Sequence, residues 1–158
     1  MAWEITRLPA HAEFPATNYP THDKRNNHPI LNFDDSTDES AYFTFLLPED
    51  YAGGGLTCTV GYSHTATTGN VDTNLAIERI GDQQLDIDAD SFHTDNVTDN
   101  VNVPSTSGNV DVVTVTFTDG ADMDSLAAGE MGRIRLTFDS PGTATGDIEF
   151  HWLKIRET

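Results

Sequence analysis

The sequence predicts an all-β protein: a jelly-roll-like antiparallel β-sandwich of about eight strands with an extended N-terminal arm. Three observations lead to this fold class. Short segments rich in Thr, Val and Ile recur from residue 29 to the end, and these residue types favour strands. Turn-forming clusters of Gly, Pro, Asn and Asp separate the segments. Within several segments apolar and polar residues alternate, which is typical of strands that bury one face in a sandwich.

The first 28 residues differ from the rest, so we divide the chain into an arm (1–28) and a sandwich domain (29–158). Prolines recur through the arm and remove amide donors. Apolar residues stand between them with no helical or strand period: Trp3, Ile5, Leu8, Phe14 and Tyr19. Because disordered tails are poor in aromatic residues, we expect an arm whose anchors contact a neighbouring subunit. A disordered tail is the alternative.

Eight or nine strands are expected after the arm, and 84–88 and 96–103 have the weakest patterns. The candidates are 29–33, 41–47, 56–64, 71–80, 84–88, 96–103, 110–118, 131–138 and 147–155. The strongest pattern is VDVVTVTFT at 110–118. One helical turn is expected at 123–130, in the link between two strands.

The charge balance is strongly acidic, with 26 Asp and Glu against 8 Lys and Arg and a net charge of −18. Such a chain repels phosphate and anionic membrane surfaces, so we expect neither a nucleic-acid nor a membrane partner. The acids are spread over segments that still carry periodic apolar residues, which favours a folded domain over an acidic tail. A folded acidic surface rich in short Asp side chains fits a protein that works in molar salt, where charge repulsion is screened. An ordinary acidic surface is the alternative.

The single cysteine, Cys58, lies in the apolar pattern LTCTV and is expected to be a buried thiol outside any disulfide. No apolar run approaches the length of a membrane-spanning helix. The first ten residues lack the apolar core of a signal peptide. We therefore expect synthesis in the cytoplasm.

Motifs that would indicate catalysis or cofactor binding are missing from the sequence. There is no G-x-S-x-G nucleophile motif, and the glycines at 53–55 lack the lysine and helix of a phosphate loop. A zinc site needs clustered ligands, whereas His64, His93 and His151 lie in separate segments. We predict no catalytic residue, no cofactor, no metal and no enzymatic activity.

The aspartates at 86, 88 and 90 raise the possibility of a calcium loop. An EF-hand would need Gly at its sixth position and Glu at its twelfth, where this chain has Ser91 and Val97. A strand reading is preferred, in which Leu85, Ile87 and Ala89 face inward and the three carboxylates face water. A cation held by loop carboxylates is the alternative. The tripeptide NVT at 96–98 is a possible glycosylation acceptor.

Three segments carry a resemblance to a known group of proteins. FDDSTDESAYFTFLLPEDYAGGGLTCTVGY (33–62) joins an acidic turn, an aromatic strand and a glycine-led strand. VTFTDGADMDSLAAGEMGRIRLTFD (115–139) and IEFHWLKIRE (148–157) supply the closing strands. This order resembles small jelly-roll virion proteins of tailed viruses, some of them capsid decoration (cement) proteins and others fibre or tail proteins. The low Lys and high Asp content would suit a virus of a halophilic archaeon.

The resemblance implies a structural virion protein, most specifically a capsid decoration protein on the virion surface. As such it would be a homotrimer that binds the major capsid protein or neighbouring virion subunits, with Trp3, Ile5, Leu8, Phe14 and Tyr19 as contacts. The alternative is a tail-fibre, turret or other virion module that binds a receptor or host glycan. Its candidate aromatic residues are Tyr51, Tyr62 and Trp152, although Trp152 also suits a core or subunit interface.

Overall fold

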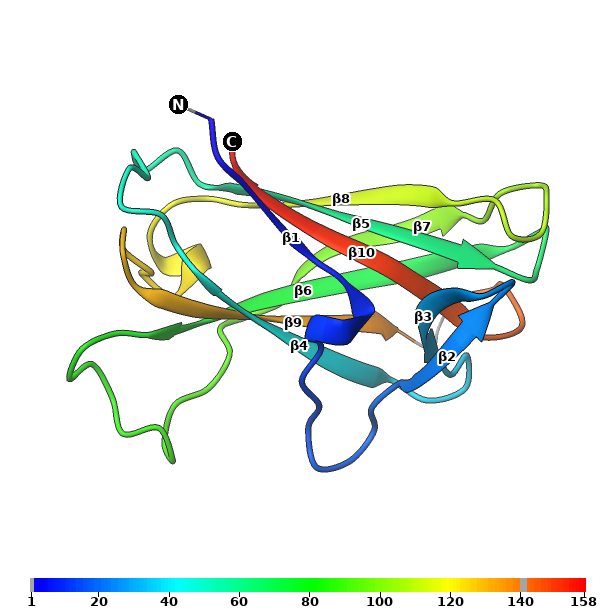
Figure 1. Cartoon of the computed structure of the whole chain (residues 1–158), viewed down its shortest axis with the longest axis horizontal. Coiled ribbons are helices and arrows are strands. Elements are labelled where there is room, and N and C mark those ends of the chain that lie inside the picture. Colours follow the sequence, from blue (N-terminus) through cyan, green and yellow to red (C-terminus); the bar gives the residue numbers. More distant parts are fainter. Residues whose placement is uncertain (1, 140–141) are drawn as a thin grey trace.

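The fold is an antiparallel β-sandwich of two sheets, as the sequence predicts (Figure 1). It was obtained as a computed structural model that describes residues 2–139 and 142–158. Sheet A contains β1 (Glu4–Arg7), β2 (Thr21–Arg25), β3 (His28–Phe33), β5 (Leu56–His64), β8 (Asp111–Phe117) and β10 (Ile148–Glu157). Sheet B contains β4 (Glu39–Leu46), β6 (Asn70–Ile80), β7 (Asn96–Asn102) and β9 (Met131–Asp139). Two short 3₁₀ helices, η1 (Pro9–His11) and η2 (Ala121–Met123), complete the described elements.

Strand order places β10 at the centre of sheet A. The order in this sheet is β2-β3-β10-β5-β8, and β1 pairs with the C-terminal half of β10. The order in sheet B is β4-β9-β6-β7. No helix in the described part of the chain is long and apolar enough to cross a membrane.

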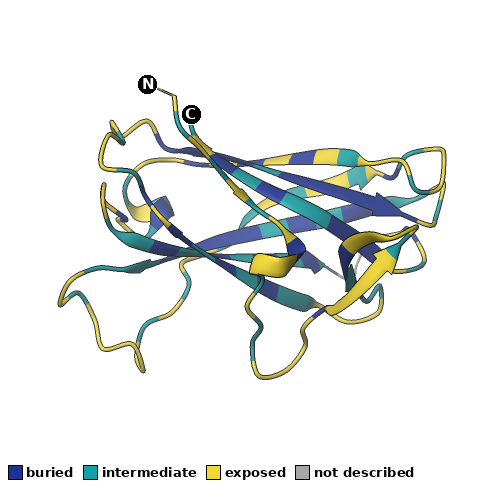
Figure 2. Cartoon of the chain, in the orientation of Figure 1, coloured by how far each residue is buried: buried dark blue, intermediate teal, exposed yellow. Residues whose placement is uncertain are grey.

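The core lies between the two sheets, where apolar side chains of alternating strand positions meet (Figure 2). Aromatic rings join the layers: Phe33 and Tyr62 of sheet A contact Phe138 of sheet B at centroid distances of 4.9 and 6.1 Å. Cys58 is fully buried in this core, as expected, and burial raises the pKa of its thiol to about 12. The period-two pattern of the sequence therefore reports the inward face correctly in these strands.

The N-terminal segment lies along its own sandwich. Its strands β1 and β2 belong to sheet A, and its middle part pairs with β4 of sheet B through backbone hydrogen bonds in both directions between Glu13 and Tyr42. Trp3, Ile5 and Phe14 pack against the core. We call residues 2–25 the N-terminal strap, because β1 and β2 extend sheet A and Glu13 pairs with β4, an edge strand of sheet B. Contact of its side chains with another subunit stays a prediction.

The prediction of a strand at 84–88 is wrong. These residues lie in the long β6–β7 loop, which extends away from the sandwich in Figure 1. Leu85 and Ile87, expected to face inward, are 56% and 69% exposed. The side chain of Asp86 accepts a hydrogen bond from the amide of Asp88, and its carbonyl accepts from Ala89. Aspartate forms such local turns readily, and here that tendency outweighs the alternating pattern.

The helical turn expected at 123–130 lies earlier in the chain, as η2 at Ala121–Met123. The backbone leaves the helix through Asp124 and Ser125, both left-handed, with φ of 54° and 58°. The carboxylate of Asp124 accepts a hydrogen bond from the amide of Arg79 on β6. A connection to sheet B therefore replaces the second half of the expected turn.

Candidate functional site

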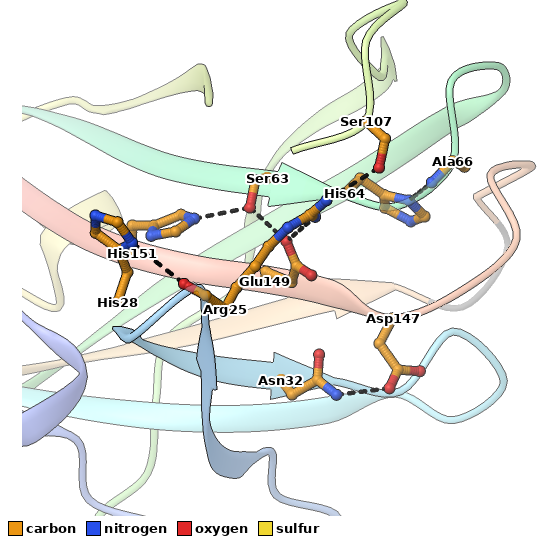
Figure 3. Close-up of polar contacts among 10 residues, drawn as sticks. All are labelled: Arg25, His28, Asn32, Ser63, His64, Ala66, Ser107, Asp147, Glu149 and His151. Carbon is orange, nitrogen blue, oxygen red and sulfur yellow. Dashed lines mark hydrogen bonds and ion pairs between the residues drawn. The ribbon is translucent and has the colours of Figure 1, made fainter. Parts of the chain in front are cut away.

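A pocket of about 390 Å³ opens on the outer face of sheet A, beside the β2–β3 hairpin (Figure 3). It falls in the size range of small-molecule sites. The lining comes from β2 and β3, β5, the β7–β8 loop and β10: Arg25, Asn26, His28, Ser63, Ser107, Gly108, Asn109, Val110 and His151. Asn26 and Asn27 turn the hairpin with φ of 46° and 65°, a conformation that Asn tolerates better than most residues. This turn brings Arg25 and His28 to the pocket.

A buried carboxylate fixes the base of the pocket. Glu149 on β10 is 7% exposed, and its Oε2 lies 2.6 Å from Nη1 of Arg25 and accepts a hydrogen bond from Ser63 Oγ. Nη2 of Arg25 donates to Ser107 Oγ at 3.0 Å. A buried charge is tolerated only when it is paired and hydrogen-bonded. The network therefore holds four segments of the chain together and orients the guanidinium within the pocket.

Ser63 and His151 are neighbours, with Ser63 Oγ 2.8 Å from Nε2 of the His151 ring. A serine hydroxyl has one proton, and Glu149, as a carboxylate, only accepts hydrogen bonds. The Ser63 proton therefore points to Glu149, and His151 Nε2 donates to Ser63 Oγ. A nucleophilic serine needs the reverse direction, with the imidazole accepting the proton. In this geometry Ser63 links His151 to Glu149 and has no activating base.

His151 owes its position to an irregularity in β10. The pairing of β10 with β5 shifts between Phe150 and Trp152, so His151 is an extra residue in the strand, as in a β-bulge. Phe150 points into the core, while His151 contacts the outward-facing Ser63. Burial lowers the pKa of His151, and the charges of His28 and Arg25 lower it further, while Glu149 acts in the opposite direction. The imidazole is therefore neutral near neutral pH.

The indole of Trp152 lies over Gly61 on the outer face of sheet A, one position along β10 from the pocket. It pairs with Gly61 of β5, and a Cβ placed on Gly61 would come within 2.3 Å of the indole ring. Glycine is thus required for the ring to lie against the strand. Gly61 also pairs with Val112 of β8, which is 48% exposed. Together Trp152 and Val112 form an apolar surface, which we call the Trp152 platform.

A second cavity, of about 400 Å³, lies at the opposite end of β5 and is lined in part by Tyr51. The hydroxyl of Tyr51 donates to Asp119 at 2.6 Å and accepts from the amide of Gly55. Burial and the Asp119 carboxylate raise the pKa of Tyr51 to about 12. Because both hydrogen-bonding positions of the hydroxyl are used within the chain, Tyr51 serves to fix the loop.

The carboxylates of the sequence prediction at 86, 88 and 90 do not form a common cation site in the structure. Within the described residues, the three carboxylates close enough to share an ion are those of Asp34, Asp35 and Asp147, with oxygens within 4.8 Å. Each has a donor of the chain: Ser36, Gly146 and Asn32, respectively. These hydrogen bonds connect the β3–β4 loop to the start of β10, and this connection explains why the three carboxylates lie close together.

The sequence identified part of this site. Of the three aromatic residues proposed for glycan contact, Trp152 lies beside the pocket, Tyr51 lines the second cavity, and Tyr62 is fully buried. Tyr62 is therefore excluded as a surface contact. Among the anchors predicted in the strap, Leu8 and Tyr19 are each 45% exposed. Of the three histidines tested for zinc, His151 lines the pocket, His64 is buried, and His93 is exposed on the β6–β7 loop.

The comparisons with known proteins concern the fold. No protein-family model matches the sequence, and no curated protein matches it. A family 35 carbohydrate-binding module from an environmental isolate has a similar structure, with a TM-score of 0.55 and 10% identity over 97% of this chain and 91% of that one. The two share an antiparallel β-sandwich of jelly-roll type.

Two further structures show the same similarity. One contains the CBM22-1 and GH10 modules of Clostridium thermocellum xylanase 10B, with a TM-score of 0.52 and 14% identity over 100% of this chain and 29% of that one. The other is the C-terminal family 6 module of LamC, a laminarinase of Zobellia galactanivorans, with a TM-score of 0.50 and 11% identity over 96% and 98%. At these identities the similarity describes the fold alone.

Proposed function

We propose that this protein is a non-catalytic carbohydrate-binding module and that its sugar site is the pocket with the adjoining Trp152 platform. The observation that carries the proposal is their juxtaposition on one exposed sheet face. A sugar ring has an apolar face and a rim of hydroxyl groups, so it needs a flat apolar surface beside fixed hydrogen-bonding groups. Trp152 supplies the first, and Arg25, His28 and His151 supply the second.

The rigidity of the site supports this function. Arg25 is held by Glu149 and Ser107, and the ring of Trp152 rests on Gly61. Groups that are already ordered lose little conformational entropy when a ligand binds, so more of the contact energy remains as affinity. The solved structures of similar fold include modules described as carbohydrate-binding, which agrees with the proposal.

The glycan-binding role is the alternative reading of the sequence, and it fits the site better than capsid decoration does. The placement of the protein in a virion, as a capsid, fibre or turret component that binds the major capsid protein or neighbouring subunits, stays a prediction from the sequence resemblance. So do the homotrimer, the location and the absence of enzymatic activity.

Affinity electrophoresis in gels that contain soluble polysaccharides tests the proposal. We expect at least one polysaccharide to retard the native protein and to have little effect on the Trp152→Ala variant, because removal of a stacking aromatic side chain deletes the platform. Tyr19→Ala is the matched control, since Tyr19 is also an accessible aromatic residue but lies on the strap. Equal retardation of the native and Trp152→Ala proteins would place the site elsewhere, and no retardation by any polysaccharide would refute the proposed function.

A further inference from the structure

The pocket differs in charge from the rest of this acidic molecule. The chain has a net charge of −18, yet none of the residues that line the pocket is acidic, and three of them can carry positive charge: Arg25, His28 and His151. The nearest carboxylate is that of Glu149, which lies beneath the pocket and is 7% exposed. A ligand in the pocket therefore meets basic groups first.

Because Arg25 and Glu149 form an ion pair at the base, the net charge of the pocket depends on the protonation of the two histidines. Arg25 and Glu149 compensate each other at 2.6 Å. The lining residues of the β7–β8 loop, Ser107 to Val110, contain no ionisable group. The next acids on the flanking strands are engaged elsewhere: Asp111 accepts a hydrogen bond from Tyr62, and Asp147 accepts one from Asn32. The pocket is thus close to neutral with neutral histidines, and each proton that they take up adds one positive charge.

The hydrogen bonds of the two rings leave a nitrogen of each for a ligand. In the described part of the chain, His28 uses Nδ1 for the carbonyl of Arg25 at 3.2 Å, and His151 uses Nε2 for Ser63. Protonation turns the opposite nitrogen of each ring into a donor with positive charge. Hydrogen bonds from charged donors to a carboxylate are about twice as strong as neutral ones.

We propose that the pocket selects sugar units that carry a carboxylate, that is, uronic acid residues of an acidic polysaccharide. This inference rests on the proposed function and adds the class of ligand. The carboxylate binds between His28, His151 and the guanidinium of Arg25, while the uncharged part of the chain lies along the Trp152 platform. A bound anion favours the protonated imidazoles, so binding takes up protons and strengthens as the pH falls through the histidine range.

The net charge of the protein opposes the approach of an anionic polymer, but salt separates this effect from contact in the pocket. At an ionic strength of 1 M the Debye length is about 3 Å, so repulsion from the distant acids is screened. Contacts in a partly buried pocket are screened much less. The selectivity should therefore be measured in molar salt, where the pocket alone decides it.

The experiment compares acidic polysaccharides with uncharged counterparts of the same backbone. Polygalacturonate, alginate and glucuronoxylan, each beside its carboxyl-reduced form, are tested in affinity gels at 1 M NaCl, at pH 5.5 and pH 7.5. We expect at least one acidic form to bind about tenfold more tightly than its reduced form at pH 5.5. This ratio corresponds to one charge-assisted hydrogen bond that the reduced form cannot make. We expect the ratio to shrink at pH 7.5.

Variants that keep the hydrogen bonds of the fold isolate the charge. His28→Asn retains a donor at the position of Nδ1, and His151→Gln retains one at the position of Nε2, and each removes the imidazolium. Each should lower affinity for the acidic form about tenfold more than affinity for the reduced form, because both forms can lose a neutral contact but only the acidic form loses the charged one. His93→Gln, on the exposed β6–β7 loop, is the control and should change neither.

The outcomes separate the two proposals. If reduced and acidic forms bind equally, or if affinity does not depend on pH or on the two histidines, the inference is overturned while the sugar-binding function stands. If no polysaccharide binds in either form, at either pH, both fall. Binding of the acidic form alone, lost in His28→Asn and His151→Gln but kept in His93→Gln, supports both.

Discussion

Replacing Gly61 with alanine tests whether the Trp152 platform is built as described. The added Cβ would lie 2.3 Å from Cε2 and 2.4 Å from Nε1 of the indole. Carbon atoms pack at about 3.5–4.0 Å, so the ring must move away from the strand by more than about 1 Å. The platform is then displaced, although no group that contacts a ligand has been removed.

Two opposing terms set the effect of Gly61→Ala on stability. Overpacking costs about 1–3 kcal/mol, whereas exchanging glycine for alanine within a strand recovers about 0.5–1 kcal/mol. The free energy of unfolding should therefore fall by up to about 2.5 kcal/mol. For a domain of this size that lowers Tm by up to about 10 °C. Affinity for the retarding polysaccharide should fall by about 2- to 13-fold, because aromatic stacking contributes about 0.5–1.5 kcal/mol beyond its area burial.

A double-mutant cycle shows whether the effect of Gly61→Ala on stability changes sign when Trp152 is removed. In a Trp152→Ala background the clash is absent, so Gly61→Ala should become neutral or stabilising by about 0.5–1 kcal/mol. Thermal unfolding of the four proteins measures the coupling, and affinity electrophoresis measures binding. If Gly61→Ala destabilises both backgrounds equally, the indole does not rest on Gly61. If Gly61→Ala folds and binds as the native protein does, the platform has no part in binding.

Three further changes probe the supports of the site. Arg25→Ala should lower the free energy of unfolding by about 1–3 kcal/mol, because it leaves the Glu149 carboxylate buried without its partner. Adding Glu149→Gln should restore most of this stability, as measured by denaturant unfolding. If the double variant shows no recovery, the ion-pair account is contradicted. Burial lowers the pKa of His64 in the folded protein. The stability that the neutral His64 contributes is therefore complete above the unfolded pKa of about 6.5 and is lost as the pH falls below that value. Tm should drop less between pH 7.5 and 5.5 in His64→Asn than in the native protein, and equal drops would refute this. Micromolar calcium should not raise Tm through residues 86–90, and a saturable rise abolished by Asp86→Asn would restore the cation loop.

The strands could be predicted from the sequence because burial of one face imposes a period of two. The run 56–64 coincides with β5, and its inward series of Leu56, Cys58 and Val60 continues to Tyr62, which is fully buried. That series indicates that Tyr62 belongs to the core, although Tyr62 is also one of the three aromatic residues proposed for glycan contact. At 84–88 the alternating pattern predicted a strand that the structure does not contain, because local turns formed by Asp compete with an alternating pattern.

The pocket could not be predicted, since its residues come from distant parts of the chain. Arg25 and Glu149 are 124 positions apart and meet only because β3 pairs with β10. The position of His151 depends on the shift in register within β10, which leaves no local signal. The platform depends on the pairing of Trp152 with Gly61, which likewise follows from register. Sequence patterns specify faces of strands, whereas sites such as this one are specified by how strands are paired.

The central claim is that carbohydrate binds beside Trp152, and ¹⁹F NMR of the protein labelled with 5-fluorotryptophan tests it directly. The chain has two tryptophans: Trp3, packed on the core at the strap, and Trp152 on the outer face of sheet A. Titration with an oligosaccharide of the retarding polysaccharide should shift the Trp152 resonance saturably and leave that of Trp3 in place. Saturable binding with the Trp152 resonance unmoved, or with only Trp3 shifted, would contradict the account.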